Sequence, residues 1–377
     1  MLKAFRSLFG RKNRGKIVVL DGDTPQCGSV AISYLTWPFQ EDPLSLRGRG
    51  HTNAREVIAM AESFVDLGFR VEISDWDDAN YTPPPDCRIA IDLHSNLERW
   101  SGSLDPSCKK VLHATGCYWK TLNLAEINRI NEIRRRKGVI LKPRRQVAPT
   151  RSPEHSDEIV VLGNSFTRAT YEFLGKPITR IPISSAFRFP FPEERNHETA
   201  RRRFLWLGSY GMAHKGLDLV LEAFAGMPDL ELTICGRPEK EDDFYGLYER
   251  ELIGTPNIHL HGWIDMASHE FREITKTHAA IVYPSCSEGG AGSVIHCMHA
   301  GMVPICTREA SVDLMDFGIL IKEGSIQAVQ DACREFASIP PSETESRARK
   351  SHDHVNRIHT IEQFTKQYND FALSILQ

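Results

Sequence analysis

Residues 279–300 read AAIVYPSCSEGGAGSVIHCMHA. The apolar run Ala279–Tyr283 predicts a buried strand, and the segment Gly292–Ala300 predicts a helix. A short turn containing one carboxylate and two glycines separates the two. Because a buried apolar strand that leads into a helix is typical of a parallel sheet covered on both faces, this stretch predicts an α/β fold.

The same alternation extends in both directions. The linker-like residues 184–200 divide the chain into two tandem, doubly wound, Rossmann-like domains, with ligands expected at the carboxyl ends of strands and between the domains. We expect a basic leader over residues 1–15, an N-terminal domain over 16–190, a C-terminal domain over 200–357, and a final helix over 358–377 that packs back on the N-terminal domain. The predicted strands are 16–20, 69–73, 88–93, 110–113, 158–162, 178–183, 204–207, 230–235, 258–260, 279–283, 303–306 and 318–321.

Composition excludes several classes of protein. Among 377 residues, 41% are hydrophobic and 25% are charged, with a net charge of −3, which is typical of a globular protein without a general affinity for nucleic acid. The nine cysteines form no CxxC pair, so the sequence predicts buried thiols in a reducing, cytoplasmic compartment and no zinc site. No apolar run is long enough for a conventional transmembrane helix.

Two segments concentrate positive charge. Residues 1–20 combine six cations with interleaved Leu and Phe and no acid before Asp21, which is typical either of an interfacial membrane anchor or of a solvated leader. The block from Arg129 to Arg151 includes Arg134, Arg135, Arg136, Lys137, Lys142, Arg144 and Arg145. Such density suits either a solvated helix end or a contact with anionic lipid or a phosphorylated acceptor. We therefore expect peripheral contact with the inner face of an anionic membrane.

The glycine-rich turn indicates a phosphate site. Neither a GxGxxG fingerprint after the first strand nor a Walker lysine loop is present, which argues against nicotinamide chemistry and P-loop phosphoryl transfer. Backbone amides at Gly289, Gly290, Ala291 and Gly292 would approach a phosphate at the start of a helix. Glu288 beside them would accept hydrogen bonds from hydroxyls, and Lys215, just before another helix, would supply a charge for a diphosphate. Phosphate and polyol recognition together predict a nucleotide sugar.

These motifs are similar to those of the GT-B glycosyltransferases of family 4, the glycosyl transferases group 1. The resemblance covers roughly residues 203–322, through Leu207-Gly208 to Lys215-Gly216, Ile234-Cys235-Gly236, Gly262, and the signature from Glu288-Gly289 to Ala300-Gly301. It implies a retaining transfer of a sugar, of the hexosyltransferase class, without a cofactor or metal. It also implies that Gly208, Arg237 and residues 289–292 bind the donor, and that Glu288 and Lys215 are catalytic.

The chain departs from this family at two positions. Where the family has a second Glu that holds the ribose, this sequence has His296, which still can exchange one hydrogen bond with a hydroxyl. Where the family has an Arg that joins the lysine on the diphosphate, this sequence has Ser209. The diphosphate would then depend on Lys215, the helix start and Arg237.

Two histidines are candidates for the acceptor side. His94 and His113 each follow a predicted strand, and the spacing does not decide which one corresponds to the histidine of related enzymes. A structural role is the alternative for both. His296 and His299 share a helix face, but no third ligand accompanies them, so no metal is expected.

The sequence thus predicts a retaining glycosyltransferase of polysaccharide biosynthesis that acts on a glycan or lipid-linked acceptor. Two alternatives remain: a nucleotide-sugar epimerase-type enzyme on the same fold, and a catalytically silent GT-B binding subunit, suggested by Ser209 and His296. The sequence identifies neither the base nor the sugar of the donor.

Overall fold

The computed structural model describes residues 17–21, 27–40 and 51–377, and these form two compact units. The N-terminal unit comprises the described residues up to Trp119 together with Ala148–Ala186 and Ile358–Gln377. The C-terminal unit comprises Lys120–Val147 and Phe187–Arg357. Residues 120–147, which the sequence places in the N-terminal domain, therefore group with the C-terminal unit. The predicted basic leader, residues 1–15, lies outside the described residues.

The N-terminal unit is built on a sheet of seven described strands in the order β1-β3-β2-β4-β5-β6-β7. All neighbouring strands are parallel except β1, which pairs with β3 in the antiparallel sense at the edge. The strands are β1 (Val18–Leu20), β2 (Ser29–Tyr34), β3 (Arg70–Asp75), β4 (Cys87–Asp92), β5 (Lys109–Ala114), β6 (Glu158–Val161) and β7 (Ile178–Arg180).

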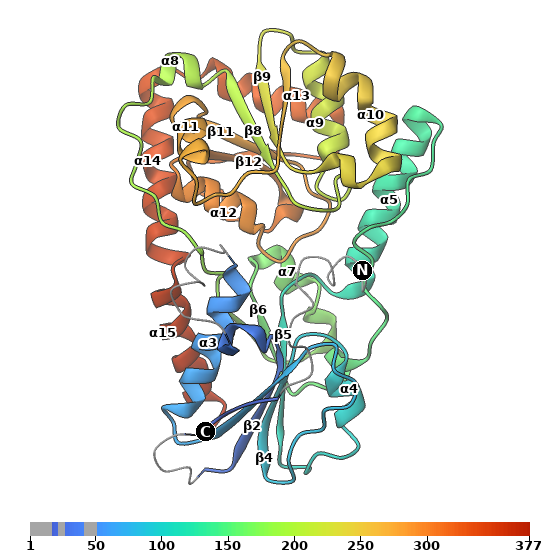
Figure 1. The fold of residues 1–377 in the computed structure, drawn as a ribbon, viewed down its shortest axis with the longest axis vertical. Helices are drawn as coiled ribbons and strands as arrows, with labels where there is room; N and C mark the ends of the chain where they lie inside the picture. Colours follow the sequence, from blue (N-terminus) through green and yellow to red (C-terminus); the bar gives the residue numbers. More distant parts are fainter. Residues whose placement is uncertain (1–16, 22–26, 41–50) are drawn as a thin grey trace. The chain divides into compact units, whose positions relative to one another are not determined.

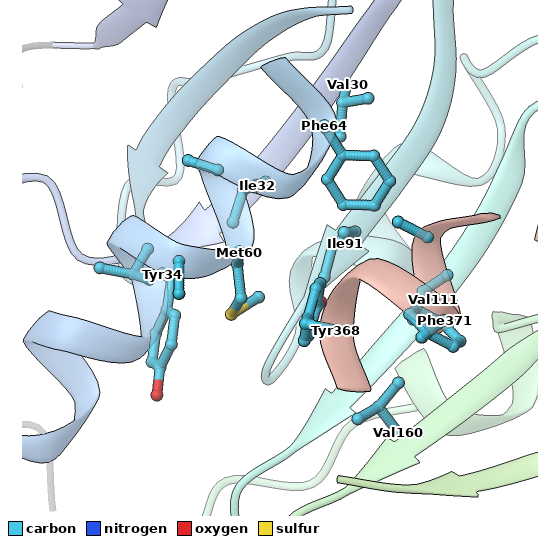
Figure 2. Packing of buried hydrophobic residues seen from close by; sticks show 14 of the residues in the cluster. Val30, Ile32, Tyr34, Met60, Phe64, Ile91, Val111, Val160, Tyr368 and Phe371 are labelled. Atoms are coloured by element: carbon cyan, nitrogen blue, oxygen red, sulfur yellow. The ribbon is translucent and has the colours of Figure 1, made fainter. Parts of the chain in front are cut away.

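One hydrophobic core cluster of the N-terminal unit lies between its sheet and two helices that are far apart in the chain. Figure 2 shows Phe64 of α3 (Thr52–Val65) and Tyr368 of α15 (Ile361–Ser374) packing over the central strands, with ring centroids 6.3 Å apart. Burial of such aromatic side chains contributes about 1.5–3 kcal/mol each, which fixes the terminal helix on this unit. The remaining helices are η1 (Trp37–Gln40), α4 (Asn96–Trp100), α6 (Ser152–His155), α7 (Ser165–Ala169) and η2 (Glu172–Leu174).

The C-terminal unit contains a fully parallel sheet of six described strands in the order β10-β9-β8-β11-β12-β13. Its central strands are apolar and buried, as expected for strands covered on both faces. The strands are β8 (Arg203–Leu207), β9 (Glu231–Cys235), β10 (Ile258–Gly262), β11 (Ala280–Tyr283), β12 (Val303–Thr307) and β13 (Ile319–Ile321).

Helices cover both faces of this second sheet, and α5 (Trp119–Lys137) lies beside α10 in Figure 1. The other helices are α8 (His197–Ala200), α9 (Leu217–Ala225), η3 (Pro238–Lys240), α10 (Asp242–Gly254), α11 (His269–Thr277), α12 (Gly292–His299), η4 (Arg308–Ala310), α13 (Ile326–Ser338) and α14 (Pro341–Ile358). Two α/β units with largely parallel sheets confirm the predicted doubly wound fold. No described helix combines the length and apolarity that crossing a bilayer requires.

Strand order places a topological switch point in each sheet. In the C-terminal unit the chain runs from β8 outward through β9 and β10, and then returns to the other side of β8 as β11. In the N-terminal unit it runs from β2 to β3 and returns on the other side of β2 as β4. Because ligands of open α/β sheets bind beyond the carboxyl ends of strands at such points, the loops after β8 and β11 and those after β2 and β4 are the expected binding positions.

Candidate functional site

Two loops meet at the switch point of the C-terminal unit, one between β8 and α9 and the other between β11 and α12. Gly216, which precedes α9, has φ 76°, and a Cβ there would lie 2.2 Å from the carbonyl oxygen of Pro284. Only glycine accommodates both the left-handed backbone and this approach. The His214 carbonyl accepts hydrogen bonds from the Cys286 amide at 2.9 Å and the Ser285 hydroxyl at 3.2 Å. The two loops therefore form one connected structure.

This connection brings Lys215 and Glu288 together. The Lys215 Nζ lies 2.9 Å from Glu288 Oε1 and donates to the Tyr283 hydroxyl at 2.7 Å. Tyr283 and Ser285 both donate to the same carboxylate oxygen, at 3.2 Å and 3.1 Å. Three donors thus fix the orientation of the Glu288 carboxylate, and the lysine and glutamate are only 8% and 9% exposed. The sequence predicted the two charged residues separately, and the structure shows them as an ion pair.

The electrostatics of this pair favour the ionised carboxylate. Burial alone would raise the pKa of Glu288, but the positive charges of Lys215 and Arg145 outweigh it and lower the pKa to about 2. Burial lowers the pKa of Lys215, an effect that the neighbouring Glu288 opposes and Arg145 reinforces. The site therefore holds an ionised carboxylate 2.9 Å from the Lys215 Nζ, and Arg145 is close enough to lower the pKa of both groups.

The predicted glycine positions lie around this pair. Gly208 follows β8, and a Cβ on it would lie 2.5 Å from the Trp206 ring and 3.1 Å from the Lys215 side chain, so the loop has no space for a larger residue. Gly290 has φ 94°. The amides of Glu288 and Ala291 donate to the carbonyls of Glu309 and Ala310, at 2.9 Å and 3.1 Å, which holds the turn that includes Gly289 against the loop after β12. Gly292 then begins α12.

The remaining donor-side candidates lie in different surroundings. Ser209 and Arg237 are both exposed, in the loops after β8 and β9, and the Arg237 guanidinium lies 4.6 Å from the centroid of the Trp263 ring. His296 is 5% exposed in α12, with its ring 5.7 Å from that of Phe187. Burial lowers the pKa of His296 to about 3, so it is neutral and can exchange single hydrogen bonds.

The two candidate histidines of the N-terminal unit differ sharply. His113 is 1% exposed within β5, between the rings of Tyr34 and Tyr368 at 5.6 Å and 5.9 Å, and burial lowers its pKa to about 3. His94 is half-buried in the loop that follows β4, at the switch point of this sheet, with its ring 5.9 Å from that of Trp76. Position in the fold therefore favours His94 as a ligand-facing group and His113 as part of the core.

Tyr283 and Ser285 are site residues that the sequence pattern did not identify. Both are less than 2% exposed, and both hydrogen-bond to Glu288. Tyr283 ends the apolar strand β11, so the sequence presents it as a core residue. The available signal was a hydroxyl-bearing residue at the end of the strand, five positions before Glu288.

The basic block is largely neutralised by acids that are distant in sequence. Arg129 and Arg136 both contact Asp218 of α9, which is fully buried, and Lys137 pairs with Glu251 of α10 at 2.9 Å. Arg144 pairs with Asp243, also on α10. For this block the sequence predicted either a solvated helix end or a contact with anionic lipid or a phosphorylated acceptor, whereas these four cations attach α5 and the following segment to the C-terminal unit. Among the described residues, no three His, Cys, Asp or Glu side chains are arranged to hold a metal ion.

One family model matches part of the chain. Residues 201–338, which contain the whole Lys215–Glu288 site, match the family model described as "Glycosyl transferases group 1". A search of curated proteins finds no match to the chain.

Solved structures resemble nearly the whole chain. Sucrose-phosphate synthase from Thermosynechococcus elongatus has a TM-score of 0.62 at 14% identity, covering 92% of this chain and 98% of its own. WaaG, a glycosyltransferase involved in lipopolysaccharide biosynthesis, has a TM-score of 0.53 at 14% identity, covering 91% and 99%. Anabaena HepE in complex with UDP and glucose has a TM-score of 0.54 at 9% identity, covering 92% and 100%. At these identities the likeness shows a shared fold.

Proposed function

Since the chain is a glycosyltransferase of the GT-B fold with a glycosyl transferases group 1 domain at residues 201–338, we propose that it uses a nucleotide-diphosphate sugar as donor. The acceptor is a glycan or a lipid-linked sugar, the transferred group is a hexose, and the anomeric configuration is retained. The structurally similar protein HepE, whose crystal structure contains UDP and glucose, supports this donor class. The observation that carries the proposal is the buried Lys215–Glu288 pair at the switch point of the C-terminal sheet.

Each part of the donor would meet a suitable group at this site. The diphosphate would contact the Lys215 ammonium and the amides of Gly289, Gly290 and Gly292 at the start of α12, where the helix dipole favours negative charge. The Ala291 amide, which the sequence also suggested, already donates to the Ala310 carbonyl. The fixed Glu288 carboxylate would accept hydrogen bonds from sugar hydroxyls, while His296 and Gly208 would line the nucleoside and phosphate positions. Ser209 contributes no charge, and Arg237 would act at the outer edge of the site.

The proposed reaction needs no nucleophilic side chain. The acceptor oxygen forms a bond to the anomeric carbon on the face from which the phosphate departs, and the departing phosphate oxygen takes the acceptor proton. The cations around the diphosphate stabilise the negative charge that develops on the leaving group, an effect that is strongest in a site of low dielectric constant. On the acceptor side, we propose that His94 rather than His113 contacts the substrate, because only His94 lies at a strand end at the switch point.

The test is product analysis with a panel of nucleotide-diphosphate hexoses and pooled glycan and lipid-extract acceptors. Mass spectrometry should detect a hexose added to an acceptor, with release of nucleoside diphosphate that depends on the acceptor. NMR of the product should show the anomeric configuration of the donor. Conversion of the donor sugar without an acceptor would instead support the epimerase-type alternative, and donor binding without any turnover would support a silent binding subunit.

The setting of the reaction is also a proposal. The reducing cytoplasm suits the nine free cysteines, most of which are buried, and peripheral contact with an anionic membrane would bring the enzyme to a lipid-linked acceptor. Because the acids of α9 and α10 neutralise four of the block's cations, membrane contact would depend mainly on residues 1–14. Flotation with anionic liposomes should therefore weaken with salt and be lost on deletion of those residues, and unchanged flotation would contradict the proposal.

A further inference from the structure

The donor site lacks one cation at the position where the resembling family has an arginine. Ser209 occupies that position and is exposed. The remaining lysine, Lys215, is already paired with Glu288 at 2.9 Å, so the charges of these two groups cancel. A diphosphate carries at least two negative charges, and such a ligand requires positive charge beyond a neutral pair.

A second cation reaches the site from a distant part of the sequence. Arg145 lies in the segment that follows α5, and its Cγ and Cδ lie 2.7 Å and 3.0 Å from the position of a Cβ on Gly211. Gly211 belongs to the loop between β8 and α9, the same loop that contains Ser209 and Lys215. The Arg145 side chain therefore crosses the phosphate-side loop of the proposed donor site.

The backbone around Arg145 is held in place by buried and paired carboxylates. Glu126, which is 1% exposed, accepts hydrogen bonds from the amides of Arg144 and Arg145, both at 2.9 Å. Asp243 accepts a hydrogen bond from the Lys142 amide at 2.7 Å and also pairs with the Arg144 guanidinium. These contacts position residue 145 without engaging its side chain.

The loop that Arg145 crosses is held just as firmly. Glu241, which is 2% exposed, accepts the Gly211 amide at 2.6 Å and the Met212 amide at 3.2 Å. The backbone at Arg145 and the loop at Gly211 are thus both held in place before a ligand binds, so binding would not have to order either segment.

The Arg145 guanidinium is not used by a structural partner. Among the described residues it forms no ion pair, unlike its neighbour Arg144, and its buried Nε atom has no hydrogen-bond partner. Its charge nevertheless acts on the site, because it lowers the pKa values of both Glu288 and Lys215. The buried Nε–H of Arg145 thus lacks an acceptor within the described part of the chain and lies near the neutral Lys215–Glu288 pair, as expected if a bound anion supplies that acceptor.

We propose that Arg145 is the second diphosphate-binding cation of this enzyme and supplies from the segment after α5 the charge that Ser209 lacks. The inference rests on the proposed function and assigns one further residue to its donor site. Arginine suits this role because its planar donors bind two phosphate oxygens at once.

The test is titration calorimetry of the full chain with UDP, GDP and ADP and with the matching nucleosides. Removal of a charged hydrogen bond to phosphate weakens binding by roughly 10- to 150-fold, so Arg145→Ala should weaken the preferred diphosphate by that factor and leave the nucleoside unchanged. Arg250→Ala, which removes an exposed arginine from α10, is the matched control and should change neither affinity.

A gain-of-function variant separates charge loss from damage to the fold. Ser209→Arg in the Arg145→Ala background should recover most of the lost diphosphate affinity, because it places a cation on the same loop. Arg145→Lys should retain part of the affinity. Wild-type diphosphate affinity in Arg145→Ala would overturn the proposal and leave the Lys215–Glu288 site intact. If the unaltered chain binds none of the diphosphates, the proposed donor site itself fails, and the role of Arg145 fails with it.

Discussion

The Lys215–Glu288 pair should be the most sensitive polar contact of the C-terminal unit. Substitution of Lys215 by Met removes the ammonium and keeps the length of the side chain, so the Glu288 carboxylate remains buried with its charge unpaired. Tyr283 and Ser285 still donate to that carboxylate, which limits the penalty. Removal of one partner from a buried ion pair costs about 3–5 kcal/mol, a large part of the stability of a domain.

A double-mutant cycle isolates this interaction. In Lys215→Met/Glu288→Gln both charges are absent, so most of the loss should be recovered, and the coupling should be at least about 2 kcal/mol. Each single loss corresponds to a decrease in the melting midpoint of roughly 6–20 °C for a unit of this size. The assay is thermal unfolding followed by tryptophan fluorescence, to which the fully buried Trp206, whose ring stacks on Tyr283, contributes. A midpoint within 2 °C of wild type for Lys215→Met, or a double variant no better than the single ones, would refute the reasoning.

Three other outcomes follow from particular residues. Burial raises the pKa of Glu56 to about 7 although Ser184 donates two hydrogen bonds to it, so folding favours the neutral form of this carboxyl. The free energy of unfolding should therefore fall by about 3 kcal/mol as the pH rises from about 4.5 to 7, and urea unfolding of Glu56→Gln should lack that decrease. Gly216→Ala should destabilise the protein by about 1–3 kcal/mol or more, because residue 216 has a φ of 76° and a Cβ there would lie 2.2 Å from the Pro284 carbonyl oxygen. The control Gly246→Ala, in open space on α10, should stabilise it by about 0.5–1 kcal/mol, and equal melting midpoints of the two variants would contradict this. Sugar transfer should continue at its full rate in excess chelator, since side-chain cations neutralise the proposed diphosphate, and loss of activity that added Mg²⁺ restores would show that a metal takes part.

The sequence predicted the C-terminal unit better than the N-terminal unit, for a physical reason. Most strands of the C-terminal sheet are short apolar runs beside a glycine or proline, which is a strong local signal. The central strand β2, Ser29–Tyr34, was missed because serines interrupt its apolar pattern and no long periodic segment flanks it, yet all six of its residues are buried. Only its pairing with β3 and β4 makes it a strand.

Helix α5 illustrates the other limit of sequence reasoning. Its apolar residues Leu124, Ile127, Ile130 and Ile133 recur at helical spacing, but Leu124 is 61% and Ile127 38% exposed. The buried face instead includes Glu126 and Arg129, whose charges are satisfied by hydrogen bonds and ion pairs within the C-terminal unit. A hydrophobic pattern cannot reveal a buried face whose polar members are satisfied by partners distant in sequence, and for the same reason the pairing of Lys215 with Glu288 was not predicted.

The most direct test of the central claim is the transfer rate of Glu288→Gln against that of Glu249→Gln, an exposed control on α10. The amide removes the charge that would hold the sugar hydroxyls and leaves the Lys215 ammonium unpaired beside the diphosphate. Loss of a charged hydrogen bond corresponds to a roughly 10- to 150-fold slower transfer. We expect this loss in Glu288→Gln, with nucleoside diphosphate affinity retained or increased and the control unchanged. Transfer at the wild-type rate in Glu288→Gln would contradict the account.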